Sequence, residues 1–214
     1  FAMKARTRTW PFGAPALPSR EALRRAGALA FLWLLALLPA ALAFDGWRHT
    51  LEGRMSLHML VEFPFLFGAG WAAQRLLARR MRARPWLRGL AWVDWRGWGG
   101  ALFATLVALA WMIPSALDAA LLSAPVDAVK IASWWAAGFW LAASWRRMDG
   151  EVALFALGNI AWMMATAGML YQQAPQALCV NYLRNDQLDA GIGLVVAAGL
   201  LGVVALRRAL VVFR

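Results

Sequence analysis

Apolar residues gather in long runs along this chain, and short segments rich in polar and basic residues separate them. A helix that crosses a bilayer core needs about 20 apolar residues. Six runs approach that length, and they cover residues 26–44, 57–77, 99–122, 130–145, 152–171 and 189–206. The pattern predicts an all-α, polytopic membrane bundle of about six transmembrane helices. The first run is expected to be a retained transmembrane helix and not a cleaved signal peptide, because further apolar runs follow it.

Composition supports the same class of protein. The 214 residues are 62% hydrophobic and only 15% charged, and their mean hydropathy is +0.56, which is too apolar for an ordinary soluble domain. The connecting segments are short, and no internal repeat is evident. We therefore expect residues 1–214 to form a single membrane domain surrounded by the lipid bilayer. Glycines within the runs are expected to allow close contacts between helices.

Basic residues mark one side of the predicted bundle. Of the 22 Lys and Arg residues, 18 lie in the two tails and near the ends of the second and fourth runs. Positively charged segments stay on the cytoplasmic side of a membrane, so both termini are predicted to be cytoplasmic in a bacterial inner membrane. The net charge of +11 thus indicates topology, and no nucleic-acid partner is expected. Residues 81–98, which combine Arg with four Trp, suit the headgroup region of that leaflet.

The sharpest polar pattern lies at the start of the second run. Four side chains there are spaced i, i+3, i+4 and i+7, which places them on one face of a helix: Met55, His58, Met59 and Glu62. Thioether and imidazole ligands suit copper, above all cuprous copper. A carboxylate this deep in a membrane helix usually faces a partner or water, so Glu62 is expected to orient His58 or to take part in a proton path. In the alternative interpretation, the methionines only fill space and His58 is only hydrogen-bonded.

Further candidates fall on the same side, which the topology makes periplasmic. Met112 adds a thioether, and His49 and Cys179 are outside candidates as metal ligands. For Cys179 an inert thiol is the favoured interpretation. Asp118 is expected to support the metal site, to cap a helix or to pair with Lys130.

Asp127 and Lys130 are one helical turn apart at the start of the fourth run. They are predicted to form an ion pair on the surface, which would contribute little to stability. The chain contains no Gly-rich phosphate loop, Ser-His-Asp set, paired-His zinc motif or CxxC sequence. It is therefore not expected to be an enzyme.

Four stretches carry a family resemblance. They are residues 54–59 (RMSLHM) with Pro64 and Gly68 downstream, 111–121 (WMIPSALDAAL), 126–130 (VDAVK) and 186–191 (DQLDAG). In this order they resemble H-M-x-x-H-M, W-H-x-P followed by D-x-A-L, V-H-x-x-x-H or a close variant, and D-Q-x-x-(A/G)-G. These are patterns of the CtaG family of cytochrome c oxidase assembly factors, membrane proteins linked to copper insertion. The resemblance begins at residue 54 and ends near residue 195.

The chain also departs from that family. Where the family has histidine, this sequence has Arg54, Met112, Asp127 and Lys130, and only His58 keeps an imidazole. Arg54 and Lys130 cannot bind a cation at neutral pH and would repel one. The resemblance therefore implies either a copper site reduced to Met and His ligands or a site that has been lost.

Two functional hypotheses follow. The first is an inner-membrane protein that assists cytochrome c oxidase assembly by holding or passing copper at the periplasmic face, with oxidase subunits or another copper chaperone as partners. Its expected ligands are His58, Met55, Met59 and Met112. The second is an accessory or scaffold membrane subunit with a degenerate metal site.

Two further functional hypotheses have weaker support in the sequence. A haem protein would need His49 and His58 as axial ligands, but nine residues apart they could not easily grip opposite faces of one haem. A transporter could use Glu62 and Asp118 as a relay, but the paired broken helices of inverted-repeat transporters are missing from the sequence pattern.

Overall fold

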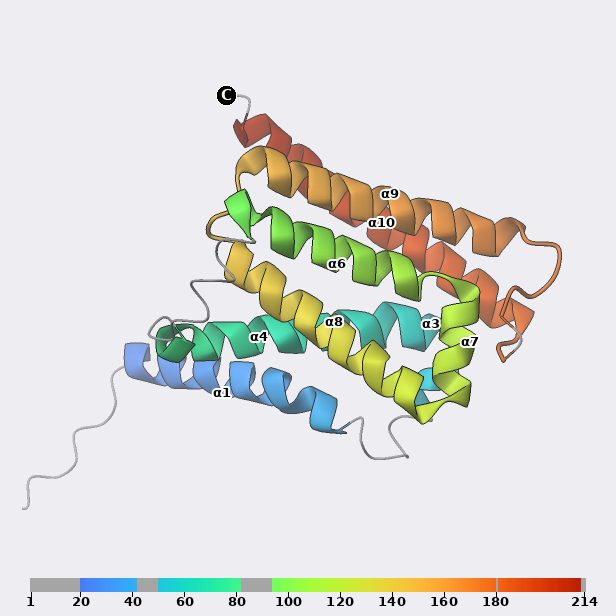
Figure 1. The fold of residues 1–214 in the computed structure, drawn as a ribbon, viewed down its shortest axis with the longest axis horizontal. Helices are drawn as coiled ribbons and strands as arrows, with labels where there is room; N and C mark the ends of the chain where they lie inside the picture. The colour runs from blue at the N-terminus through green and yellow to red at the C-terminus, as the bar shows by residue number, and fades with distance from the viewer. Residues whose placement is uncertain (1–19, 42–49, 82–93, 180, 213–214) are drawn as a thin grey trace, which may run out of the picture.

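The computed structural model describes residues 20–41, 50–81, 94–179 and 181–212, and this part of the chain is built of helices without a strand (Figure 1). The long helices are α1 (Arg20–Ala41), α4 (Phe63–Met81), α6 (Trp98–Trp111), α8 (Ala124–Ser144), α9 (Gly150–Gln173) and α10 (Arg184–Val212). The short ones are α3 (Met55–Leu57), the π-helix η1 (His58–Glu62), the 3-10 helix η2 (Trp95–Gly97) and α7 (Pro114–Leu122). The all-α prediction is confirmed.

Two helices are long and apolar enough to cross a membrane, Gly150–Gln173 and Arg184–Leu210. A third candidate exists if Trp95–Trp111 and Pro114–Leu122 are counted as one broken span. Among the described residues this number is smaller than the six expected from the apolar runs. One cause is that the apolar part of α1 extends only over Ala26–Leu37. Another is that the second run is divided between η1 and α4, with a basic residue already at Arg75.

Two of the expected helices have different bounds for reasons of backbone chemistry. The helix predicted over residues 99–122 is broken into α6 and α7, which meet at 77°. Pro114 lacks an N–H and cannot continue α6, so it begins a new helix instead. The fourth helix begins at Ala124 and not near residue 130, with a proline in its first turn. This extension brings Asp127 and Lys130 into the bundle.

Glycines permit one very close helix crossing. A Cβ added to Gly70 of α4 would lie 1.9 Å from the carbonyl oxygen of Trp135 in α8, and a Cβ added to Gly138 would lie 1.9 Å from that of Phe67. Backbones can approach this closely only where side chains are absent. The prediction that glycines allow close helix contacts is confirmed at this crossing.

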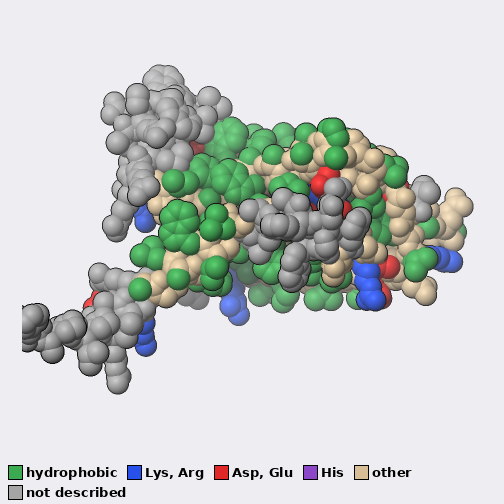
Figure 2. All heavy atoms as spheres, turned by 90° about the horizontal axis from the view of Figure 1, so that it is seen from below, with side chains coloured by type: hydrophobic (Ala, Val, Ile, Leu, Met, Phe, Trp, Pro, Cys, Tyr) green, Lys and Arg blue, Asp and Glu red, His purple; other side chains and the backbone are tan. Residues whose placement is uncertain are grey.

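The surface of the bundle carries large apolar side chains. Trp162 of α9 is 69% exposed and Leu200 of α10 is 67% exposed, and Figure 2 shows hydrophobic side chains over much of the face seen from below. A soluble monomer rarely exposes so much contiguous apolar surface, whereas contact with lipid requires it.

The two ends of the bundle differ in their charges. At one end lie α3, α7 and the first turns of α8 with Lys130, and we call this the lysine end (Figure 1). At the other lie the C-terminal turns of α4, α8 and α10 with Arg75 and Arg208, and Arg147 in the turn that follows α8, and we call this the arginine end.

Candidate functional site

A buried charge cluster occupies the lysine end. The side chain of Lys130 is fully buried. Its Nζ lies 2.6 Å from Glu52 Oε1 and 2.8 Å from Glu62 Oε1. The same nitrogen lies 2.9 Å from Asp127 Oδ1 and 3.0 Å from His58 Nε2. All five residues are buried, and we call them the Lys130 cluster.

The cluster corrects one prediction. Asp127 and Lys130 do form an ion pair, but it lies inside the bundle and not on its surface. Taking an ammonium group out of water is costly unless charged partners and hydrogen bonds replace the water. Carboxylates from three separate parts of the chain supply that replacement, so the pair belongs to a network instead of standing alone.

A local change of helix type positions two members of the cluster. The N–H of Phe63 donates to the carbonyl oxygen of His58, the wider spacing that defines the π-helical turn η1. From this turn the side chains of His58 and Glu62 both reach Lys130. Such turns are rare in proteins overall, but the ones that occur are often found at functional sites.

The start of this segment is held by the last helix. The carboxylate of Asp186, in the first turn of α10, accepts hydrogen bonds from the N–H of Met55 and from Ser56, whose Oγ lies 2.6 Å from Asp186 Oδ1. The first N–H groups of a helix have no partner within it, so an acceptor from elsewhere satisfies them. Asp186 therefore caps α3 and fixes the entry to η1.

Both nitrogens of His58 have protein partners. Nδ1 lies 2.6 Å from the hydroxyl of Tyr182, and Nε2 faces the ammonium of Lys130. Because an ammonium can only donate, Nε2 acts as the acceptor, and Nδ1 then carries the proton and donates to Tyr182. The imidazole also packs edge-on against Phe63, which stacks on Trp134. Little rotational freedom is left to this ring.

The ammonium cannot satisfy every neighbour. It has three protons, while four acceptor atoms lie within 3.0 Å of it. Glu62 Oε2 is buried without a hydrogen-bond partner in the described part of the chain and lies 3.7 Å from His58 Nε2. Acceptors thus exceed donors in the cluster.

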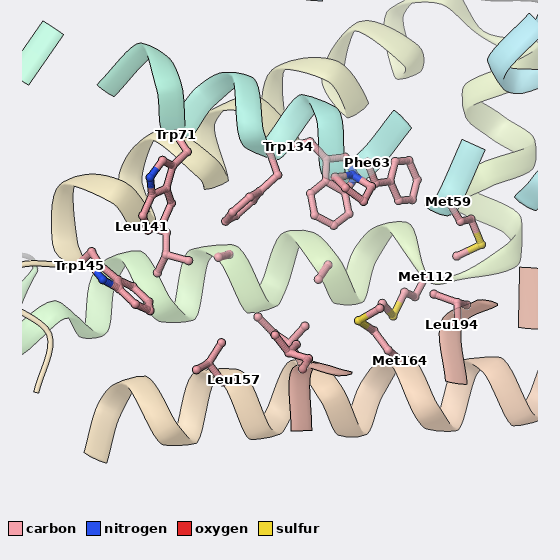
Figure 3. A pocket seen from close by; sticks show the side chains of 16 residues that line it. Met59, Phe63, Trp71, Met112, Trp134, Leu141, Trp145, Leu157, Met164 and Leu194 are labelled. Atoms are coloured by element: carbon pink, nitrogen blue, oxygen red, sulfur yellow. The ribbon is translucent and has the colours of Figure 1, made fainter. Parts of the chain in front are cut away.

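The predicted thioether ligands lie in apolar surroundings. Met55 belongs to the hydrophobic core, and Met59 and Met112 line an apolar cavity of about 430 Å³ together with Met164 (Figure 3). His49 lies outside the described residues. Met55 and Met59 are both buried, and the lining of this cavity is almost entirely apolar.

Two other candidates have structural partners. Asp118 Oδ1 accepts a hydrogen bond from Asn181 Nδ2 at 3.0 Å. Cys179 is fully buried, with its Sγ 3.9 Å from the carbonyl oxygen of Pro114. Burial raises the pKa of the Cys179 thiol to about 12. A thiol in this state is a poor nucleophile and a poor metal ligand.

The arrangement does not fit cuprous copper. Ligand atoms of Glu52, His58 and Glu62 lie within 4.8 Å of one another, a spacing that a metal ion could span. The ammonium of Lys130, however, contacts all three residues. Two of them offer hard carboxylate oxygens, whereas cuprous ion prefers sulfur and imidazole. The positive charge already present among these groups would repel a second cation.

Sequence reasoning missed two participants. Glu52 stands 78 residues from Lys130 in the chain, and Tyr182 stands 124 residues from His58. No local spacing pattern can reveal such contacts. The available signal was a count, because the predicted periplasmic side held several carboxylates and very few basic residues to neutralise them.

Comparison with known proteins gives no assignment. No protein-family model, curated protein or solved structure matches the chain.

Proposed function

We propose that this chain is a membrane-embedded accessory or scaffold subunit, related to the CtaG-like assembly factors, in which the ammonium of Lys130 stands where a metal ion would otherwise be held. The observation that carries the proposal is the contact of Lys130 Nζ with His58 Nε2 at 3.0 Å inside a set of carboxylates. The proposal includes six membrane passes and cytoplasmic termini. The basic residues of the arginine end support a cytoplasmic position for that end.

The resident charge explains why a scaffold is favoured over copper delivery. A copper carrier must release and rebind its ion, so its ligands need free lone pairs and access to a partner. Here the lone pair of His58 Nε2 faces an ammonium, and the ring is locked by Tyr182 and Phe63. The cluster is built to hold helices together around one internal cation, a role that specifies a unique packing.

A scaffold needs a partner, and the surface offers apolar area for one. The exposed Leu and Val side chains along α9 and α10 can pack against lipid or against the helices of another membrane protein. The sequence resemblance suggests subunits of cytochrome c oxidase as that partner. Copper delivery through His58, Met55, Met59 and Met112 is the competing proposal.

The experiment that separates these proposals is purification of the full chain from its native membrane in mild detergent. Co-purifying subunits and bound metal are measured for the wild type and for the His58→Ala variant. We expect respiratory-complex subunits in stoichiometric amounts and no copper. Recovery of the chain alone with one copper ion, lost in His58→Ala, would overturn the scaffold proposal in favour of copper delivery.

A further inference from the structure

The apolar cavity beside η1 continues toward the arginine end of the bundle. Helices α4, α6, α8, α9 and α10 all contribute to its lining. Its volume of about 430 Å³ falls within the range of roughly 300–1,000 Å³ typical of sites for small molecules. Figure 3 shows Met59 and Leu194 at one end of the cavity and Trp71 with Trp145 at the other. The lining contains no charged side chain.

Two arginines lie against the far end of this cavity. Trp71 and Trp145 meet edge to face with ring centroids 5.5 Å apart. The guanidinium of Arg75 lies 5.6 Å from the centroid of Trp71, and that of Arg208 lies 4.7 Å from the centroid of Trp145. Both arginines are exposed, and neither has a carboxylate partner within the described ranges. The same pair of aromatic rings thus separates an apolar chamber from two available positive charges.

We propose that this cavity binds one anionic phospholipid of the surrounding bilayer, with an acyl chain between the helices and the phosphate group at Arg75 and Arg208. Guanidinium groups bind phosphate oxygens through paired hydrogen bonds. Basic pockets between helices on the cytoplasmic side of a membrane protein suit anionic headgroups. The aromatic rings lie at the level where the apolar chain gives way to the polar headgroup.

Charge decides between this occupant and the others. A zwitterionic lipid would bring a phosphate, but its own cationic headgroup would leave the two guanidinium charges without net compensation. A purely apolar partner helix would fill the chamber and bring no anion at all. A free phosphate ion would meet the arginines but leave the apolar chamber unfilled. Only an amphipathic anion matches both halves of the site. This inference does not depend on the role proposed for the Lys130 cluster, which lies at the other end of the bundle.

The test uses the full chain in detergent micelles with added phosphatidylglycerol or phosphatidylcholine, and native mass spectrometry counts the lipids retained. We expect one phosphatidylglycerol to be retained in preference to phosphatidylcholine. Arg75→Gln and Arg208→Gln should each weaken retention about fivefold, and the double variant roughly 25-fold. Arg207→Gln is the matched control, because Arg207 is an exposed neighbour in the same helix turn that stacks on neither ring.

The chamber is tested separately by Leu201→Trp, which places a larger side chain at a residue of the lining. It should reduce phosphatidylglycerol retention while leaving the arginines unchanged. Equal retention of the two lipids, or equal effects of Arg207→Gln and Arg208→Gln, would overturn the proposal. So would displacement of the lipid by inorganic phosphate alone, or a co-purified protein helix in place of lipid. A helical circular dichroism spectrum checks that each variant is folded.

Discussion

The two ends of this bundle handle positive charge in opposite ways. At the lysine end one ammonium is completely buried and is surrounded by three carboxylates and an imidazole. At the arginine end Arg75 and Arg208 are exposed and rest on aromatic rings. A buried charge depends on its internal partners, so it serves to hold the fold, whereas an exposed charge without an acid partner is free to meet a ligand.

The largest effect is expected from removing the buried ammonium. Lys130→Met leaves three carboxylates facing one another in an apolar interior, and the loss of a partner in a buried ion network costs about 3–5 kcal/mol. Equilibrium unfolding of the purified protein in micelles measures the change. The corresponding change at the other end, Arg208→Gln, should alter the free energy of unfolding by no more than about 0.5 kcal/mol, as for an ordinary surface site.

A second variant sharpens that comparison. Adding Glu62→Gln to Lys130→Met removes one of the uncompensated carboxylates, so part of the lost stability should return. If Lys130→Met and Arg208→Gln cost the same, the contrast between a buried and an exposed cation is wrong.

The next largest effect concerns the helix crossing that lies between the two ends. Gly70→Ala would place a methyl group against the carbonyl oxygen of Trp135, where no space exists. Pushing α4 and α8 apart should cost about 1–3 kcal/mol in the free energy of unfolding. Gly158→Ala is the matched control, because nothing lies within 4 Å of its added Cβ. That variant should be neutral or slightly more stable.

A smaller effect is expected from the cap that orients the lysine end. Asp186→Ala removes the acceptor for the first N–H groups of α3, and loss of such a cap costs about 1 kcal/mol. Asp189→Ala removes an exposed carboxylate one turn further along α10 and should have no measurable effect. Identical unfolding curves for the two variants would show that Asp186 does not hold η1 in place.

The smallest response is expected at Cys179. Because burial raises the pKa of its thiol to about 12, the reactive thiolate is scarce at pH 8. Its fraction rises about tenfold for each unit by which the pH increases toward that pKa. A maleimide reagent should therefore modify the folded protein very slowly at pH 8, as followed by mass spectrometry. The exposed position in Gln176→Cys, made together with Cys179→Ala, should react fast. Rapid labelling of the wild type would contradict the burial of this residue.

The sequence predicts the helices well and their partners poorly. Apolar runs locate the helices because burial against lipid or neighbouring helices demands long apolar segments. Spacing also places His58 and Glu62 on the inner side of one segment, where both are buried. Pro114 could have indicated the break between α6 and α7, since proline rarely continues a helix.

The position of Lys130 could not be predicted from local pattern. One turn from Asp127, it has the spacing of an ordinary surface pair. Its burial depends on Glu52, Glu62 and His58, which lie far away in sequence and approach it only when α8 packs against η1. Periodicity describes one helix at a time, whereas a buried charge network is a property of several helices together.

The central claim is that Lys130 supplies the cation of this cluster, and a cuprous titration tests it most directly. The protein is purified in detergent under reducing conditions, and binding is measured against a competing chelator for the wild type, His58→Ala and Lys130→Ala. We predict no stoichiometric cuprous binding by the wild type or by His58→Ala. A gain of affinity is expected only in Lys130→Ala, and for Zn²⁺ titrated in parallel, because carboxylate and imidazole ligands suit that ion better than cuprous copper. One tightly bound cuprous ion in the wild type, lost in His58→Ala, would contradict the claim.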